Sequence, residues 1–374
     1  MARFLRAVCA LLSGFTLISC LPTESLKVEF PQHLKVPRIV VGQDTFKKSV
    51  FFEQASLGPI TDIRYSQFTN RREPALVIVG GLGATFLGED RQATRTVHFQ
   101  RQLSERVALV HVKADTAPWF LGQSMRSVVL YDQTGAVRWT YSSFWGIDDA
   151  AAGDVNGDGV AEVAVGLNGF GGLRLLNADG HQLWGRYGDG NIWHVEILPA
   201  DGANPARIFH TEAGGELKVR DARGEVIARH RPDFYVSHFS LTRWGDELQA
   251  GHFVSVGDGY ILVYDLNGQQ TQRLDAPGCD RLGDAVGTPV RFAAGGTHYA
   301  TLVDYSLWNR ALLLVHDPTG RLIYEEVLPE RCAALGTISA GDGEELLAGC
   351  TGTVWEYSVV SAAQRGKAGR GKRR

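Results

Sequence analysis

Short apolar runs recur along the chain, and polar turns rich in Asp, Asn and Gly separate them. Val128–Tyr131 lies before one such turn, and Val137–Trp139 follows it. Asp or Asn opens a type I turn by hydrogen bonding to the backbone, and Gly takes the left-handed position that closes it. A turn of this kind between two strand-like runs predicts a β-hairpin. Five turns share this composition: Asp132-Gln-Thr-Gly135, Asn177-Ala-Asp-Gly180, Asp221-Ala-Arg-Gly224, Asp265-Leu-Asn-Gly268 and Asp317-Pro-Thr-Gly320.

The predicted hairpins recur at a nearly constant spacing. Their closing glycines are separated by 45, 44, 44 and 52 residues. A repeat of roughly 40–50 residues in an all-β chain is typical of a β-propeller, with one four-stranded blade per repeat. The period extends backwards to a turn at Gly88–Arg91 and forwards to the run Thr353–Tyr357. We therefore predict an all-β fold, a single propeller over residues 38–360 with seven four-stranded blades.

The last predicted blade lacks an outer strand, because its final apolar run leads almost directly into the C-terminal tail. A segment near the N-terminus, either Leu26–Phe30 or Arg38–Val41, would supply that strand and close the ring. Closure is expected because the first and last blades would otherwise expose unpaired strand edges.

Residues 153–166 hold the most specific motif in the chain. Oxygen donors recur at alternating positions: the side chains of Asp154, Asn156, Asp158 and Glu162, and the carbonyl of Val160. Gly159 permits the sharp turn that brings the Val160 carbonyl toward the others. Calcium takes six to eight oxygen ligands, so this spacing predicts one calcium site. The alternative is a metal-free turn, since Asp, Asn and Gly favour turns anyway.

The residues after this motif exclude an EF-hand, which needs a bidentate acid at the twelfth position and flanking helices. The twelfth position here is Val165, inside a strand-like run. Asp154–Glu162 instead resembles the calcium loop of FG-GAP (VCBS) propeller repeats, although Glu162 stands where that family more often has Asp. The Phe-Gly element of that family is matched by Phe170-Gly171, and its Gly-Ala-Pro element is missing. The resemblance implies one structural calcium between the first two strands of a blade.

The N-terminus has the pattern of a secretory signal. Arg3 and Arg6 precede a short apolar stretch, Ala7–Leu17, that is too short to span a bilayer. It ends in Leu17-Ile18-Ser19-Cys20, which resembles the lipobox of bacterial lipoproteins. That resemblance implies a cleaved signal over residues 1–19, lipid on Cys20 and a tether over residues 20–37 that also includes a candidate closing strand. Leu21 after the cysteine implies sorting to the bacterial outer membrane, and an ordinary signal peptide is the alternative.

The charge balance argues against nucleic-acid binding. Without residues 1–19 the chain has 36 basic and 41 acidic side chains, a formal charge of −5. Phosphate recognition needs a clustered positive field instead. The exception is the tail, residues 361–374, which carries six positive charges and is expected to be disordered.

Three cysteines follow Cys20 in the chain, and export makes a disulfide admissible. Cys332 and Cys350 flank a predicted hairpin turn and are the candidate disulfide pair. Cys279 and Cys332 hold similar places in successive repeats, so they are a second possible pair, and free buried thiols are the third possibility.

No catalytic motif is found in the sequence, which lacks a Gly-x-Ser-x-Gly elbow, a His-Glu-x-x-His helix and a Gly-rich phosphate loop. Trp139, Trp184 and Trp355 lie beside hairpins and are expected to pack between blades. Residues near strand ends and loops either pack or line a recognition face: Trp145, Trp193, Trp244, Trp308, Phe234, Tyr235 and His238.

These patterns predict a non-enzymatic, monomeric propeller that is anchored by lipid, binds calcium and presents a protein- or glycan-binding face at the bacterial cell envelope. Propellers suit such a role because a rigid ring holds variable loops in fixed positions. One alternative is a scaffold resembling the outer-membrane assembly lipoprotein of the PQQ-like propeller family, whose repeats also carry Asp-x-x-Gly turns before a Trp. The other is a propeller enzyme, either a quinone-dependent dehydrogenase or a polysaccharide lyase.

Overall fold

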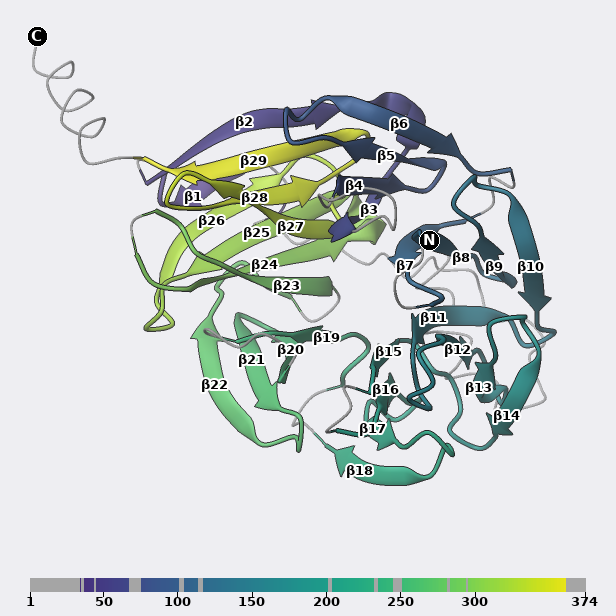
Figure 1. The fold of residues 1–374 in the computed structure, drawn as a ribbon. Coiled ribbons are helices and arrows are strands. Elements are labelled where there is room, and N and C mark those ends of the chain that lie inside the picture. The colour runs from purple at the N-terminus through teal and green to yellow at the C-terminus, as the bar shows by residue number, and fades with distance from the viewer. Residues whose placement is uncertain are drawn as a thin grey trace, which may run out of the picture.

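The described residues form a seven-bladed β-propeller, as the repeat spacing predicted. The structure is a computed structural model that describes residues 34, 37–43, 45–66, 75–100, 104–113, 117–200, 204–231, 235–244, 251–280, 283–293 and 295–360. Figure 1 shows the first strand of each blade nearest the centre of the ring and the last strand at the rim.

Each blade is an antiparallel sheet, and in blades 1 to 5 the strands follow one another in chain order from the centre outwards. Blade 1 contains β3 (Ile60–Ser66), β4 (Ala75–Gly80), β5 (Gly83–Leu87) and β6 (Ala93–His98). Blade 2 contains β7 (Arg106–Val110), β8 (Trp119–Gln123), β9 (Ser127–Tyr131) and β10 (Val137–Ser142). Blade 3 contains β11 (Ile147–Gly153), β12 (Glu162–Leu167), β13 (Gly172–Leu176) and β14 (Gln182–Arg186).

The remaining blades repeat this order, and the last two recruit strands from the N-terminal part of the chain. Blade 4 contains β15 (Val195–Leu198), β16 (Arg207–Thr211), β17 (Leu217–Arg220) and β18 (Val226–His230). Blade 5 contains β19 (Ser240–Thr242), β20 (His252–Gly257), β21 (Tyr260–Asp265) and β22 (Gln270–Asp275). Blade 6 contains β23 (Asp284–Val290), β24 (His298–Tyr305), β25 (Arg310–His316), β26 (Leu322–Leu328) and β1 (Arg38–Val41). Blade 7 contains β27 (Ala334–Ala340), β28 (Gly343–Gly349), β29 (Thr353–Val359) and β2 (Phe46–Glu53). Two short 3-10 helices are η2 (Ala55–Leu57) and η3 (Ser306–Trp308).

The middle strands of the blades are buried on both faces, which explains their continuous apolar runs. Every residue of β12 and β13 is buried, whereas the outer strand β10 alternates between half-buried and exposed positions. Successive residues of a strand point to opposite faces of the sheet. Val163 and Val165 therefore pack against blade 2, while Ala164 between them packs against blade 4.

Hydrophobic clusters fill the spaces between neighbouring blades. The described residues form seven such clusters, one for each pair of adjacent blades around the ring. A blade alone would leave both of its apolar faces in water. Burial of apolar surface, worth about 25 cal/mol per Å², therefore holds the blades together as a closed set.

A strand from the N-terminal part closes the ring, as the sequence predicted, but neither segment chosen for this role supplies it. β2 pairs antiparallel with β29, from Phe46 opposite Val359 to Glu53 opposite Thr353. Arg38–Val41 was one candidate, and that assignment is wrong: it forms β1, which pairs with β26 as a fifth strand of blade 6. The other candidate, Leu26–Phe30, lies outside the described residues.

A buried polar cluster fastens the closing strand. Lys48 on β2 forms an ion pair with Glu326 of blade 6, with 2.8 Å between Nζ and Oε1. The hydroxyls of Tyr324 and Tyr357 donate to the other oxygen of Glu326 at 2.9 and 2.8 Å. The ammonium of Lys48 also lies 4.2 Å from the ring centroid of Trp355, a cation–π distance. Glu326 thereby joins blades 6 and 7 to the N-terminal strand.

The predicted hairpin turns also link neighbouring blades. In the turn of blade 2, Asp132 Oδ1 accepts hydrogen bonds from the backbone of Thr134 and Ala136. Trp139 on the outer strand of blade 2 donates from Nε1 to a turn carbonyl of blade 3, and Trp184 of blade 3 does the same to blade 4, at 2.8 and 3.0 Å. The tryptophans beside the hairpins therefore pack between blades.

Cys332 and Cys350 are joined by a disulfide in blade 7, and Cys279 is a buried free thiol. Residues 1–33, which include Cys20 and the predicted signal, and the tail 361–374 lie outside the described residues. Within the described part of the chain, no helix is both long and apolar enough to cross a membrane.

Candidate interaction face

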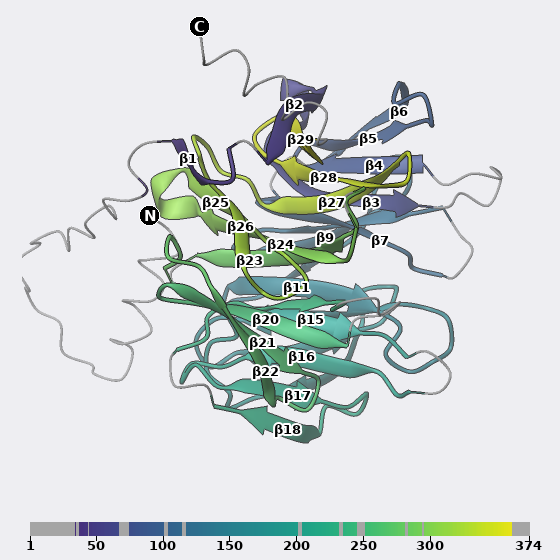
Figure 2. The ribbon, with the colours of Figure 1, turned by 90° about the vertical axis from the view of Figure 1, so that its left-hand side faces the viewer.

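The ring has two faces that differ in the connections they carry. Neighbouring strands of a blade are antiparallel, so successive connections alternate between the two ends of the strands. One end carries the links between blades and those between second and third strands, and we call it the loop face. The other end carries the first-to-second links and the third-to-fourth hairpins, and we call it the turn face. Most strands run across the view in Figure 2, so the two faces lie at its two sides.

The predicted calcium loop lies on the turn face, between β11 and β12 of blade 3. Its side chains accept hydrogen bonds from the loop's own backbone. Asp154 accepts from Gly157 and Gly159 at 2.7 and 2.9 Å. Asn156 accepts from Asp158, and Asp158 from Val160, at 2.9 and 2.8 Å. Glu162 accepts from the Val155 amide and from the Asn156 side chain, both at 2.9 Å.

Glu162 is the buried member of this loop, with 4 % of its surface exposed. Burial raises the pKa of its carboxyl, and the charges of Asp158 and Asp154 raise it further. The donor set is all oxygen and includes three carboxylates, so its chemistry fits a calcium ion. No group of three His, Cys, Asp or Glu side chains placed to hold a metal is found in the described part of the chain.

The same loop connects three blades through its backbone. The Ala161 amide donates to the carbonyl of Val112 in blade 2 at 2.8 Å, and Lys113 forms a β-bridge with Val160. On the other side, the Ala200 amide donates to the carbonyl of Asp154 at 3.0 Å. The loop is thus a structural joint between blades 2, 3 and 4.

Exposed aromatic side chains gather on the opposite side of the molecule, on the loop face of blades 2 to 4. Phe144 is 97 % exposed, Tyr187 is 70 % exposed and Phe170 is 61 % exposed. Trp145 and Tyr235 are also exposed, and Trp193 is half-buried. We call this group the aromatic arc: Phe144, Trp145, Phe170, Tyr187, Trp193 and Tyr235.

Contacts within and between the loops join members of the arc. The ring of Trp145 lies 5.8 Å from that of Phe144 and 6.2 Å from that of Phe170, both edge to face. At the far end, Trp193 donates a hydrogen bond from Nε1 to the hydroxyl of Tyr235. The backbone of Gly169 donates to the side chain of Asn191, which ties the Phe170 loop to the loop between blades 3 and 4.

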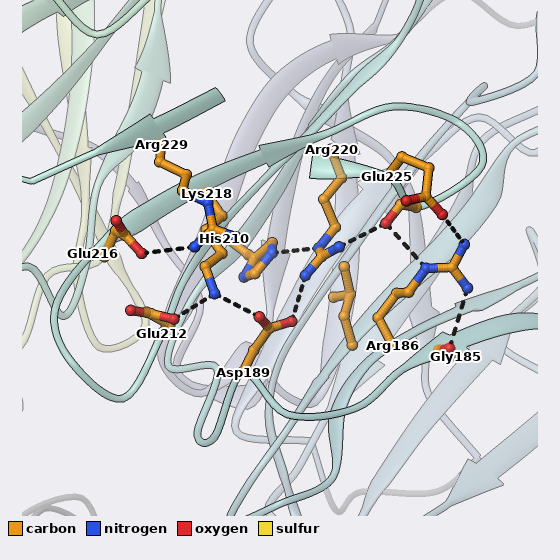
Figure 3. Close-up of polar contacts among 12 residues, drawn as sticks. Gly185, Arg186, Asp189, His210, Glu212, Glu216, Lys218, Arg220, Glu225 and Arg229 are labelled. Atoms are coloured by element: carbon orange, nitrogen blue, oxygen red, sulfur yellow. Dashed lines mark hydrogen bonds and ion pairs between the residues drawn. The ribbon is translucent and has the colours of Figure 1, made fainter. Parts of the chain in front are cut away.

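A buried ionic network lies beneath the loop that carries Tyr187 and Trp193 (Figure 3). Asp189 receives Lys218 on one oxygen at 2.7 Å and Arg220 on the other at 2.6 Å. Lys218 also forms an ion pair with Glu212 at 2.5 Å. Burial opposes ionisation of Asp189, but the hydrogen bond from Lys218 and the nearby positive charges lower its pKa. The network fixes the position of this loop because Lys218 and Arg220, both on β17, form ion pairs with Asp189 in the loop.

His210 on β16 completes this network in its neutral form. Arg220 donates from Nε to His210 Nε2 at 2.9 Å, and His210 Nδ1 lies 3.0 Å from the carbonyl of Thr211. An acceptor at Nε2 and a donor at Nδ1 define the neutral tautomer with the proton on Nδ1. Burial lowers the pKa of His210 to about 4, and the charges of Arg220 and Lys218 act in the same direction.

A second polar cluster lies where the inner strands of blades 2 to 5 meet. His194 Nδ1 lies 2.6 Å from Asp149, and its Nε2 lies 3.1 Å from Glu196. Burial would lower the pKa of His194, but Asp149 and Glu196 raise it to about 9. The two carboxylates also accept backbone amides of the next inner strand, Val195 and Leu241, at 3.1 and 3.0 Å. Asp149 and Glu196 thus accept hydrogen bonds from backbone amides at the inner edges of blades 4 and 5, where no further strand pairs with the sheet.

The structure divides the residues that were predicted either to pack or to form a face. Trp145, Trp193 and Tyr235 are on the loop face, whereas Trp244 and Trp308 pack on Tyr299 and Tyr305. His238 stacks on His194 with 3.8 Å between ring centroids. Phe234 lies outside the described residues. Phe144 and Tyr187 were not predicted to lie on this face, because a single aromatic residue in a loop has no sequence pattern that separates exposure from burial.

No protein-family model and no curated protein matches the sequence. Solved propellers do match the fold. BBS1N in complex with ARL6DN, soaked with mercury, has a TM-score of 0.58 at 14 % identity, over 84 % of this chain and 97 % of that chain. The same complex soaked with lead has a TM-score of 0.56 at 13 % identity, over 84 % and 98 %.

A third similar structure is the WD40 domain of Neurospora crassa Pan2, with a TM-score of 0.50 at 13 % identity, over 85 % of this chain and 96 % of that chain. At such low identity these likenesses concern the fold alone. The resemblance to FG-GAP repeats stays a prediction. In fold, the chain is a seven-bladed β-propeller.

Proposed function

We propose that this chain is a non-enzymatic propeller that binds a protein partner through the aromatic arc on its loop face. The observation that carries this proposal is the gathering of exposed aromatic side chains on adjacent loops of three blades. Monomeric proteins rarely expose contiguous apolar patches without an interaction role. Tyr, Trp and Arg dominate the binding energy of protein interfaces.

The similarity in fold also supports a protein partner, since BBS1N is a propeller that was crystallised with the protein ARL6DN. The arc can supply only part of an affinity. A large aromatic side chain buries about 150–250 Å², so covering Phe144, Phe170 and Tyr187 would gain roughly 10 kcal/mol at about 25 cal/mol per Å². Association costs roughly 4–15 kcal/mol, so the partner must make further contacts beyond these three side chains.

Site-specific crosslinking in the native host tests the arc. A benzophenone amino acid at position 144 or 170 should yield a crosslinked protein adduct. Leu183 and Val50 are matched controls, because they are exposed apolar residues on the outer strands of blades 3 and 7. Equal adducts from arc and control positions, or none from the arc, would contradict the proposal. If the protein binds glycans on an array and gives no protein adduct, its partner is a glycan and not a protein. Turnover of polyuronides, or of sugars with added quinone, would show that the protein is an enzyme.

The proposed setting is the bacterial outer membrane, with the chain anchored through lipid on Cys20. The lipobox-like end of the N-terminal apolar stretch supports this part of the proposal. Stable anchoring requires more than one acyl chain, as lipoproteins carry. Cys20→Ser should move the protein from the membrane to the soluble fraction and abolish labelling by radioactive palmitate. Unchanged labelling would rule out Cys20 as the lipid site.

A single calcium ion in the Asp154–Glu162 loop is proposed to brace blade 3.

A further inference from the structure

We infer that Arg229 and Arg231, at the blade 4 end of the aromatic arc, bind a carboxylate group of the partner. This inference rests on the proposed function, because it names the chemistry of the partner at one edge of the same face. We call the two residues the arginine fork.

A buried carboxylate holds the fork in place. Glu216 is 5 % exposed and lies at the start of β17, in the link between the second and third strands of blade 4. Its Oε1 accepts Arg231 Nε at 2.7 Å, and its Oε2 accepts Arg229 Nη1 at 3.4 Å. Figure 3 shows the side chain of Arg229 reaching Glu216 at one end of the buried network. A buried acid that orients two arginines restricts them before any ligand arrives, which reduces the entropy lost on binding.

The free donors of the fork are directed to solvent. The side chains of Arg229 and Arg231 are 54 % and 80 % exposed. Arg231 uses Nε for Glu216, and its two terminal nitrogens have no partner among the residues that the structure describes. A guanidinium presents paired donors that match the two oxygens of a carboxylate. Glu216 neutralises one of the two positive charges, and the fork keeps a net charge of +1 within a chain whose formal charge is −3.

The fork is continuous with the aromatic arc. Tyr235 lies against Gly215, the residue before Glu216: a Cβ added at Gly215 would lie 2.7 Å from the Tyr235 ring. The Val236 amide also donates to the Gly215 carbonyl at 3.4 Å. Gly215 has φ +77°, a left-handed conformation that favours glycine, so this close approach depends on the absence of a side chain. An aromatic surface that ends in two oriented arginines fits an apolar protein segment followed by an Asp or Glu.

Two probes test the fork directly on the full chain. Titration with the methylamide of N-acetylglutamate should shift the NMR signals of Arg231 and Arg229 side chains in a saturable way. The methylamide of N-acetylglutamine is the neutral match and should not. Equal shifts with both compounds, or none, would overturn the inference. A third titration, with inorganic phosphate, distinguishes a carboxylate ligand from a phosphate ligand. A larger shift of the arginine NMR signals with phosphate would also overturn the assignment to a carboxylate.

Crosslinking separates failure of the fork from failure of the arc. In the variant R229Q/R231Q, the adduct formed through position 170 should fall about tenfold or more, since hydrogen bonds to charged groups contribute that much. R126Q is the matched control, because Arg126 is an exposed arginine at the blade 2 end of the arc. Unchanged melting temperatures would show that both variants fold. If the adduct persists unchanged in R229Q/R231Q, the fork is wrong while the arc stands. If position 170 gives no adduct in the native sequence, the proposed function itself fails.

Discussion

Two buried histidines of blade 4 have opposite charge states because their neighbours differ. His194 lies between the carboxylates of Asp149 and Glu196, and its pKa is raised to about 9. His210 accepts a hydrogen bond from the cation Arg220, and its pKa is lowered to about 4. At neutral pH the first is therefore a cation and the second is neutral. Residue type alone does not decide the role of a histidine in this ring.

His210 should make the protein less stable as the pH falls from about 6.5 to 4. The unfolded chain binds a proton in this window and the folded chain does not, so stability decreases by up to about 1.4 kcal/mol per pH unit. Above pH 6.5 the effect is absent. In His210→Gln, which keeps an acceptor for Arg220 but cannot be protonated, the loss of stability over this window should be smaller by up to about 3 kcal/mol.

The measurement is urea unfolding at pH 7, 6, 5 and 4.5 for wild type and for His210→Gln. His181→Gln serves as the control, because His181 is an exposed histidine in the hairpin of blade 3. Parallel pH profiles for wild type and His210→Gln would show that His210 is not the neutral acceptor described above.

Sequence patterns identified some residues of the interaction face and not others. Trp145 and Trp193 were candidates because each follows or precedes a strand-like run near a loop. Phe170 was noted only as part of a family-like Phe-Gly element. The arginine fork depends on Glu216, and nothing in the sequence indicates that this buried carboxylate binds two arginines at the end of an outer strand. Such contacts arise from the packing of loops, which has no period in the sequence.

At the scale of single elements, the hairpin turns were predictable and the closing strand was not. The Asp-x-x-Gly turns recur because local hydrogen bonds and a left-handed glycine define them, as Gly135 at φ +83° shows. The closing strand depends instead on a partner 300 residues away. Both Arg38–Val41 and Phe46–Glu53 have strand-like composition, so composition could not assign them to blades.

Calcium bound in the Asp154–Glu162 loop should stabilise the fold. If calcium binds with a dissociation constant of ~0.1 mM, then ~1 mM calcium should stabilise the fold by roughly 1.4 kcal/mol. A chelator should therefore lower the melting temperature of the wild type by about 2 °C. Asp158→Asn keeps the acceptor for the Val160 amide but removes a charge, so its melting temperature should not respond to chelator.

Differential scanning calorimetry with and without EGTA checks this prediction. Asp179→Asn, in the exposed hairpin turn of the same blade, is the control and should respond as the wild type does. A melting temperature that is indifferent to EGTA in wild type and in Asp158→Asn would remove calcium from the loop.

The stability of the closed ring depends on the contacts that hold β2 beside β29. Lys48 neutralises Glu326, whose side chain is 9 % exposed. Removing the cation leaves a buried carboxylate with only two tyrosine hydroxyls, and breaking such a pair costs about 3 kcal/mol, less where one partner is partly exposed. Lys48→Met, which keeps the apolar stem against Trp355, should therefore destabilise the protein by about 2 kcal/mol.

Guanidinium unfolding and limited proteolysis measure this effect. Lys47→Met is the matched control, since Lys47 is the exposed neighbour on the same strand. The strand β2 should also be cleaved sooner in Lys48→Met than in Lys47→Met. Equal stability and equal cleavage of the two variants would show that the ion pair does not fasten the ring.

The way the ring is joined also sets the order of events during biosynthesis. Ser49 on β2 and Glu356 on β29 are in contact and lie 307 positions apart. β2 is made early and must wait, unpaired, until the last strand of the chain has been synthesised. Contacts between such distant residues form slowly, because a long loop must close first. For most of its synthesis the chain therefore has two open strand edges, which are sites of aggregation unless a chaperone covers them.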